Sequence, residues 1–260
     1  MALGFTVETL LPYGRSGSRL TMGLSRLDEA DWLWPDFDRL ARQTVFDRHP
    51  EAIRILPEAE AAGCELAAML GLSGGLGEAA RTVWEDLCIL QSAGPGEPYR
   101  LTGAAVGFPT DWRLEDKIGL PLAAIHAPIH GYAEQLTSGV DRFMEGLAPG
   151  PIFGRANWFV VANDSWRYLP ESNPQKLFSH VSAESAGNSL FVRCERQTLR
   201  RLPQSGAIVF TIGIAVAPLA SLPRAQVERL VAALSAQPED EQGRRSAPAY
   251  LDALAGYCLS

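Results

Sequence analysis

The most informative absences in this sequence are of clustered cysteines and of long apolar runs. The chain has 260 residues and four widely spaced cysteines, with no CxxC pair and no zinc-binding spacing. No apolar run reaches the roughly 20 residues that cross a membrane, and the N-terminus carries Glu8 but no basic segment, unlike a signal peptide. We therefore expect a reduced, cytoplasmic protein that does not enter a membrane.

Basic charge and nucleotide-binding motifs are also scarce. The 23 Lys and Arg residues are outnumbered by 30 Asp and Glu residues, and the net charge of −7 argues against a nucleic-acid partner. No GxGxxG follows an extended run, so the sequence has no recognisable flavin or nicotinamide site. No cysteine cluster suits an iron–sulfur centre. Any redox chemistry would therefore need electrons from another molecule.

The residues that are present indicate a globular α+β protein. Apolar residues make up 47% of the chain, which is enough to bury a full core. We expect a single domain over 1–260, with a mainly helical part over about 1–98, a sheet core over about 99–220 and C-terminal helices over 221–260.

Local patterns predict the elements of these parts. Ala, Glu and Leu dominate residues 57–71, and Trp84, Leu87 and Leu90 recur at helical spacing within 77–91, so we expect a helix in each segment. An apolar stripe predicts one later helix, and Ser221 followed by Pro223 predicts the start of another. The polar stretch 236–248 is typical of a mobile loop. The helices are expected at 132–147 and 221–234, the strands at 100–108, 155–162, 188–201 and 207–217, and a hairpin turn at 203–206.

Two stretches crowd charged, aromatic and histidine side chains between apolar flanks. The first runs from Phe108 to Pro128 and contains FPTDW, DKIG and IHAP, and the second is Arg193–Pro203. Buried charges are costly unless they are paired or ligated, so a chain that keeps them in apolar surroundings is expected to use them.

His126 is the candidate metal or heme ligand, because Pro121 and Pro128 stiffen the backbone around it. The alternative is a core histidine bonded to a backbone carbonyl, and spacing alone favours that alternative. His130 lies four residues further on, but the intervening Pro128 argues against a helical two-histidine metal site. His49 and His180 lie in polar surroundings and are expected to be solvated.

The second stretch is expected to be a strand, in which side chains alternate between faces. Arg193, Glu195 and Gln197 would share one face, and Cys194, Arg196 and Thr198 the other. The Arg and Glu could form a surface ion pair, or they could line a polar pocket that binds a carboxylate and an amine. Asn157 and Trp158, in RANW at 155–158, form a third patch, which could instead be packing at the edge of the sheet.

Six motifs in order resemble the heme-dependent oxidative N-demethylase alpha-subunit family. They are MGL at 22–24, FP-x-x-W at 108–112, DKIG at 116–119, IHAP at 125–128, RANW at 155–158 and RCERQTLRRLPQSGAIVFTI at 193–212. The last block is the most specific, and together the motifs extend the resemblance over roughly residues 5–220.

The resemblance implies a PAS-like antiparallel sheet core that holds heme b. It implies oxidation of a small amine with dioxygen, of the oxidative N-demethylation type, in which a methyl group leaves as formaldehyde. Heme-dependent N-hydroxylation of an amine or a guanidine such as arginine is an alternative, and a heme PAS-type gas sensor is another. The absence of CxxCH predicts that the heme is bound without covalent attachment.

The same resemblance suggests site roles. His126 would be the axial ligand of the heme iron, with His130 as the next candidate and a possible catalytic histidine. Lys117, Arg193 and Arg196 would bind the heme propionates, because an anionic cofactor in a dry pocket needs cations. Glu195 would hold a cationic amine over the heme, with Arg193 as a further catalytic candidate and with Asn157 and Trp158 nearby.

The sequence departs from the family pattern at three positions. His130 stands where a second proline is usual, and Gly213 and Ala215 stand where an Arg and a Tyr are usual. The family pairs its heme chain with separate redox subunits, so we expect a partner reductase, or peroxide in its place. The alternative is that the amine itself supplies both electrons. A homodimer is also compatible with the sequence.

Overall fold

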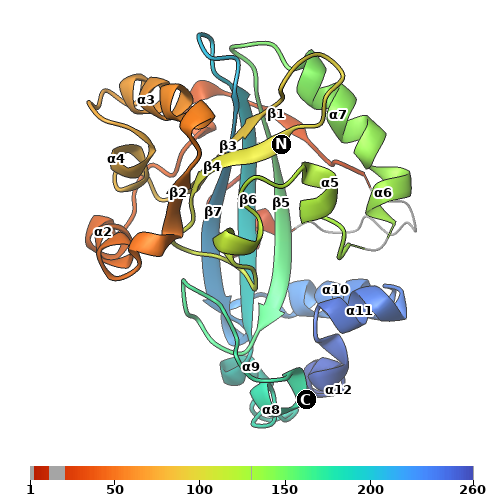
Figure 1. Ribbon diagram of the computed structural model, residues 1–260. Coiled ribbons are helices and arrows are strands. Elements are labelled where there is room, and N and C mark those ends of the chain that lie inside the picture. The colour runs from red at the N-terminus through yellow and green to blue at the C-terminus, as the bar shows by residue number, and fades with distance from the viewer. Residues whose placement is uncertain (1–2, 12–20, 130, 260) are drawn as a thin grey trace.

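The computed structural model describes residues 3–11, 21–129 and 131–259, which form one seven-stranded sheet with helices on both faces (Figure 1). The strands are β1 (Ser25–Leu27), β2 (Ile53–Ile55), β3 (Asp86–Gln91), β4 (Arg100–Ala105), β5 (Ile152–Val161), β6 (Phe191–Arg201) and β7 (Ile208–Pro218). Their order across the sheet is β1-β5-β6-β7-β3-β4-β2, and every neighbouring pair is antiparallel. The prediction of an α+β fold with an antiparallel sheet is confirmed.

The helices are short. They are α1 (Val7–Leu10), α2 (Arg39–Arg48), α3 (Glu60–Met69), α4 (Leu76–Ala80), α5 (Leu122–Ile125), α6 (Tyr132–Gln135), α7 (Thr137–Gly146), α8 (Pro174–Leu177), α9 (Ala186–Ser189), α10 (Arg224–Ser235), α11 (Glu239–Arg244) and α12 (Leu251–Tyr257). No helix among the described residues has the length and apolar character needed to cross a membrane.

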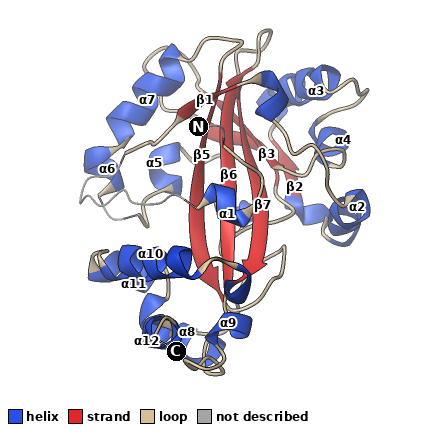
Figure 2. Ribbon diagram, turned by 180° about the vertical axis from the view of Figure 1, so that it is seen from behind, coloured by secondary structure: helices blue, strands red, loops and turns tan. Residues whose placement is uncertain are grey.

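We call the sheet face on which α5–α7 pack the front face. Its apolar side chains include Phe153 from β5, Leu199 from β6 and Phe210 from β7, which pack with Tyr132 and Val140. The opposite face, here the back face, is covered by α2–α4 over one part and by α1, α9, α10 and α12 over another (Figures 1 and 2). The core therefore lies in two layers, one on each side of the sheet.

The hairpin that the sequence predicted is formed by β6 and β7, and it lies at the centre of the sheet. The register pairs Arg201 with Ile208 next to the turn, where Gly206 takes a left-handed φ of +69°. Glu65, on α3, accepts hydrogen bonds from the backbone N–H groups of Gln204 and Ser205, each at 2.7 Å. A helix from the N-terminal part thus holds the hairpin turn in place.

The part expected to be mainly helical contains α1–α4, but the helix predicted over 77–91 is wrong. Only 76–80 is helical within the predicted helix 77–91, because Leu87–Leu90 form the centre of β3 between β4 and β7. β1 and β2 also lie in this region. A run of four apolar residues suits a strand that is buried on both faces, and pairing with distant strands overrides the helical spacing.

The predicted loop at 236–248 is wrong in its main part, which forms α11. Glu241 there accepts hydrogen bonds from Arg244 and Arg245, whose nitrogens lie 2.6–2.8 Å from its carboxylate. Arg245 also donates to the Trp158 carbonyl at 2.5 Å. These contacts tie a polar segment to the edge of β5.

Candidate functional site

His126 ends α5 and faces the front of the sheet with one ring nitrogen already engaged. Its Nδ1 lies 2.8 Å from the Leu122 carbonyl, and its ring stacks on Tyr132 with 4.5 Å between centroids. With the proton on Nδ1, the hydrogen bond fixes the ring and leaves Nε2 as the atom able to ligate a metal. Burial lowers the pKa of His126, although the Leu122 carbonyl opposes this effect, so the imidazole is held neutral as a ligand requires.

Two cations lie close enough to His126 to lower its pKa further. They are Arg155, in the RANW motif on β5, and Lys117, in the DKIG motif. Lys117 Nζ donates to the Ile125 carbonyl at 3.4 Å, and Arg155 donates to the Met22 carbonyl at 3.2 Å. The structure therefore brings four of the sequence motifs together at one place. Arg155 was missed by the sequence analysis, although period-2 alternation puts it on the same face as Asn157.

The centre of the front face is incompletely sealed. Arg155, Asn157, Gln197 and Phe210 are half-buried, although they lie on central strands. The aromatic side chains around them, Trp112, Phe143 and Phe153, are also partly buried, with Phe143 edge-on to Phe153 at 5.3 Å. An apolar wall with a few inward polar groups is typical of a cofactor-binding surface.

Glu195 lies further along this face, opposite Asn157 in the register. Its carboxylate accepts a hydrogen bond from the Gln197 side chain at 2.9 Å and is nearly buried, at 6% exposure. Arg193 and Arg244 lie near enough for the charge of Glu195 to raise their pKa values, although burial lowers that of Arg193 overall to about 10. Asn157, Gln197 and Glu195 therefore form one polar patch on β5 and β6.

Arg193 lies on the front face but is fully used by the protein. Its guanidinium donates to Thr110 Oγ1 and to the carbonyls of Phe108, Pro109, Ser165 and Trp166, at 2.8–3.1 Å. The side chain has no exposed surface. Arg193 therefore clamps the FP-x-x-W loop to β6, and its donors do not face a propionate or a substrate.

Arg196 and Trp158 lie on the back face, away from His126. Arg196 is buried, donates to the Trp32 carbonyl at 3.0 Å and to the Asp31 carbonyl, and lies 4.3 Å from the Phe5 ring. Trp158 packs with Cys194 and the C-terminal helices. The structure thus separates Arg196 and Trp158 from the His126 cluster. The reason is the alternation of side chains along a strand, which also puts Arg193 and Glu195 together on the front face.

The remaining predicted histidines are resolved as follows. His130 lies outside the described residues. His49 is 40% exposed beside Glu51, and His180 is exposed, as expected for solvated histidines.

The two positions of β7 that depart from the family pattern lie on the back face. Gly213 packs there against Trp34 and Glu85, and Ala215 joins the back core. They therefore remove no side chain from the front-face patch.

A buried ion pair that the sequence analysis missed supports the FP-x-x-W loop. Arg42, on α2, bonds Asp86 at 2.7 Å, and Asp86 also accepts from the backbone N–H groups of Gly107 and Phe108. A Cβ at position 107 would lie 2.8–2.9 Å from Val45 and Arg42, so glycine is required there. No local pattern could have linked residues 42, 86 and 107, because they meet only in the tertiary structure.

The chain matches the family described as "Haem-dependent oxidative N-demethylase, alpha subunit-like" over residues 74–255. The chain belongs to this family. The family is that of an oxidative enzyme subunit and depends on heme, so the resemblance read from the six motifs is confirmed. No curated protein matches the chain.

The residues around His126 fit a heme. A neutral imidazole with Nδ1 bonded to a carbonyl is the usual arrangement of an axial histidine. Lys117 and Arg155 would supply the positive charge that propionates need, and Trp112, Phe153 and Phe210 would supply apolar contact. We therefore assign the front face beside His126 as the candidate heme site.

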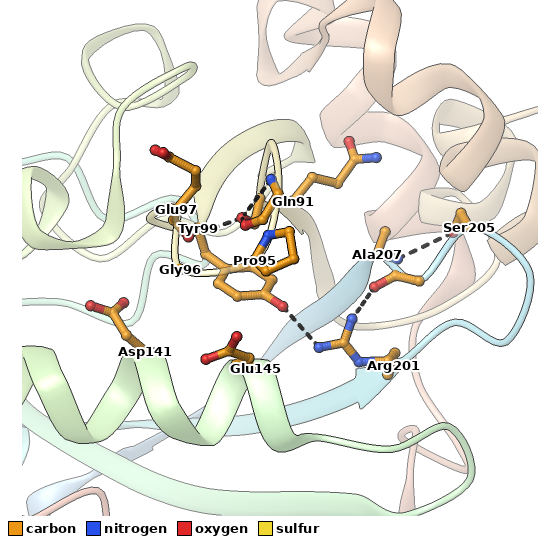
Figure 3. A pocket seen from close by; sticks show the side chains of 13 residues that line it. Gln91, Pro95, Gly96, Glu97, Tyr99, Asp141, Glu145, Arg201, Ser205 and Ala207 are labelled. Atoms are coloured by element: carbon orange, nitrogen blue, oxygen red, sulfur yellow. Dashed lines mark hydrogen bonds between the residues drawn. The ribbon is translucent and has the colours of Figure 1, made fainter.

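A separate cavity of about 310 Å³ lies between the 92–97 loop, α7 and the hairpin turn. Figure 3 shows Tyr99 and Arg201 within it, with Asp141 and Glu145 on α7 pointing toward them. Arg201 donates to the Tyr99 hydroxyl at 2.8 Å and to the carbonyls of Leu147, Met144 and Gly206. Its guanidinium is engaged by the protein, so this cavity does not present it to an anionic ligand.

Proposed function

We propose that the chain binds heme b non-covalently on the front face and uses it for the dioxygen-dependent oxidation of a small amine, in the manner of an oxidative N-demethylase. One observation carries the proposal. His126 is fixed by the Leu122 carbonyl, with Lys117 and Arg155 beside it, in a chain of a heme-dependent family. When bound, the heme would supply the centre that activates dioxygen.

His126 would hold the iron through Nε2, and Lys117 and Arg155 would pair with the propionates. Trp112 and Phe210 would keep water from the apolar edge of the cofactor. His130 stays the alternative axial ligand.

Glu195 is the proposed anchor for the amine. A carboxylate at 6% exposure attracts an ammonium strongly and can accept its proton. Gln197 holds one carboxylate oxygen at 2.9 Å, and Asn157, opposite on β5, offers an amide to the same ligand. Arg193 would not contact the amine. It would contribute by fixing the FP-x-x-W loop that forms one side of this surface.

The first test is of the heme ligand. Purified His126→Ala should lose the Soret band of the wild-type protein or shift it sharply, whereas His49→Ala should keep it unchanged, because His49 pairs with Glu51 at the surface. An unchanged heme spectrum in His126→Ala would reject His126 as the ligand, and His130→Ala would then be measured.

The second test is of the reaction. The reduced protein is incubated with a panel of amines and dioxygen, and formaldehyde and hydroxylated products are assayed separately. Formaldehyde is the expected product, and Glu195→Gln should reduce its rate by about 100-fold or more. A hydroxylated product instead would establish N-hydroxylation, and tight ligand binding without turnover of any amine would favour a gas sensor.

A further inference from the structure

A second cleft lies at the open edge of β7, and its described lining residues do not include Lys117, Tyr132 or Arg155, which lie beside His126. β3 pairs with β7 only from Ile208 to Ile212, whereas β7 continues to Pro218. Beyond β3, the Trp84 indole N–H covers this edge by donating to the Ile214 carbonyl at 2.8 Å. A cleft of about 400 Å³ opens beside the uncovered part of the strand.

Five of the 13 residues that line this cleft are aromatic. They are Phe5, Trp34, Phe37, Trp84 and Trp166. Trp166 stands edge-on to Trp84 at 4.9 Å, and Phe5 stands edge-on to Trp34 at 5.3 Å. Trp84 is buried, and the Phe5 and Phe37 rings already lie against the guanidiniums of Arg196 and Arg39. Trp34 and Trp166 keep exposed surface, and a pair of tryptophan rings is an arrangement that can bind a methylated ammonium group.

The walls are also held rigidly. Trp34 donates its backbone N–H to Glu85 at 2.8 Å, and the Trp166 carbonyl accepts from Arg193 at 2.9 Å. Trp84 is 5% exposed. Because these rings are positioned by the fold, little conformational entropy is lost when a ligand enters.

The charged side chains among the residues that line this cleft are acidic, whereas the Arg39 and Arg196 guanidiniums lie over the Phe37 and Phe5 rings. Asp36 and Asp38 line it, and no Lys, Arg or His is among its described lining residues. Asp38 caps α2 by accepting from the Ala41 N–H at 2.9 Å. Asp36 makes no hydrogen bond or ion pair within the part of the chain that the structure describes, so its carboxylate faces solvent at the cleft without a cation.

We propose that this cleft binds a methylated ammonium compound of about the size of choline, with the cationic head against the tryptophan faces and Asp36 as its counter-ion. An anion would meet two carboxylates and electron-rich rings, and a neutral apolar molecule would leave the carboxylates uncompensated. The site is distinct from the heme surface, so it would recognise an ammonium compound whether or not the front face carries out the proposed reaction.

The test compares choline with 3,3-dimethylbutan-1-ol, its neutral isostere in which carbon replaces the ammonium nitrogen. Binding to the full chain is followed by calorimetry and by tryptophan fluorescence. Choline should bind at least about tenfold more tightly than the neutral isostere. Asp36→Asn should weaken choline binding about threefold and Trp166→Ala about tenfold, while Asp252→Asn, an exposed carboxylate on α12, should leave it unchanged.

Three outcomes would overturn the proposal. The first is equal binding of choline and its isostere, and the second is no binding of choline. The third is binding that His126→Ala abolishes but Asp36→Asn and Trp166→Ala do not change, which would place the ammonium on the front face. Thermal melts of each variant confirm that it is folded, and Asp36→Asn changes only a solvent-facing group.

Discussion

At the scale of single residues, Arg193 shows how much a motif can contribute to structure rather than to chemistry. Its acceptors lie between 27 and 85 positions away in the sequence, and four of the five are backbone carbonyls. One side chain thus joins β6, the FP-x-x-W loop and the 165–166 segment. The charged block that begins at Arg193 therefore serves partly to hold two loops against β6.

Replacement of Arg193 should consequently destabilise the protein more than it changes any single contact with a ligand. Arg193→Met leaves several buried carbonyls without donors, so the free energy of unfolding should fall by about 3 kcal/mol or more. Arg142→Met, at an exposed position with one bond to the Ser138 carbonyl, should change it by less than about 0.5 kcal/mol. Urea unfolding measures both, and equal midpoints would show that the clamp contributes nothing.

Glu85 is the residue with the clearest expected pH effect. Its carboxylate is buried, one oxygen accepts from Trp34 and the other has no partner among the described residues. Burial raises the pKa of Glu85 to about 7, although Arg196 and Arg42 act against that rise. In the unfolded chain the group titrates near its ordinary value, so folding is favoured below about pH 4.5 and this contribution is lost as the pH rises toward 7.

Glu85→Gln should remove that loss. Relative to the wild type, the variant should gain stability between pH 5 and pH 8, by an amount on the order of 3 kcal/mol. Other carboxylates are common to both proteins and cancel in the difference. Urea unfolding at several pH values measures the gain, and parallel stability curves for the two proteins would contradict the assignment.

At the scale of elements, β3 and α11 show the two ways in which local patterns misled. Leu87–Leu90 have helical spacing with Trp84 but lie between two strands. The 236–248 segment is polar, yet Arg245 stacks on Trp158 and Phe159, with its guanidinium 5.0 and 5.1 Å from their rings. Both segments take their structure from distant partners.

Arg245 is therefore expected to hold α11 against β5. Arg245→Met removes the bonds to Glu241 and the Trp158 carbonyl, so α11 should detach and residues 236–248 should be cleaved faster in limited proteolysis, by about tenfold. Arg142→Met is the control, since it lies on α7. Mass spectrometry of the fragments locates the cleavage, and an unchanged rate would show that other contacts fix α11.

At the scale of the whole molecule, the chain is expected to depend on an external electron source. Its family is described as alpha subunit-like, and the sequence has no flavin, nicotinamide or iron–sulfur motif. When the isolated heme protein is mixed with amine anaerobically, the heme should stay oxidised, and it should be reduced only on addition of a reductase or a chemical donor. Reduction of the heme by the amine alone would show that no partner is needed. Turnover with peroxide would show that peroxide can take the place of the reductase.

The sequence by itself determined the family, the sheet class and the face on which each residue of β6 lies. These follow from short-range properties: motif order, the alternation of side chains along a strand and the turn residues before Gly206. They suffice to put Glu195 and Gln197 on one face and Arg196 on the other.

Only the tertiary structure decided which charged groups gather around His126. Lys117 and Arg155 meet there because α5 packs over β5. Arg193 instead donates its hydrogen bonds mainly to backbone carbonyls, and Arg196 is held on the back face. The same holds for the aromatic cleft, whose rings come from segments between Phe5 and Trp166. Such clusters depend on packing between residues far apart in the chain, and the energy of each buried charge depends on partners that no local pattern names.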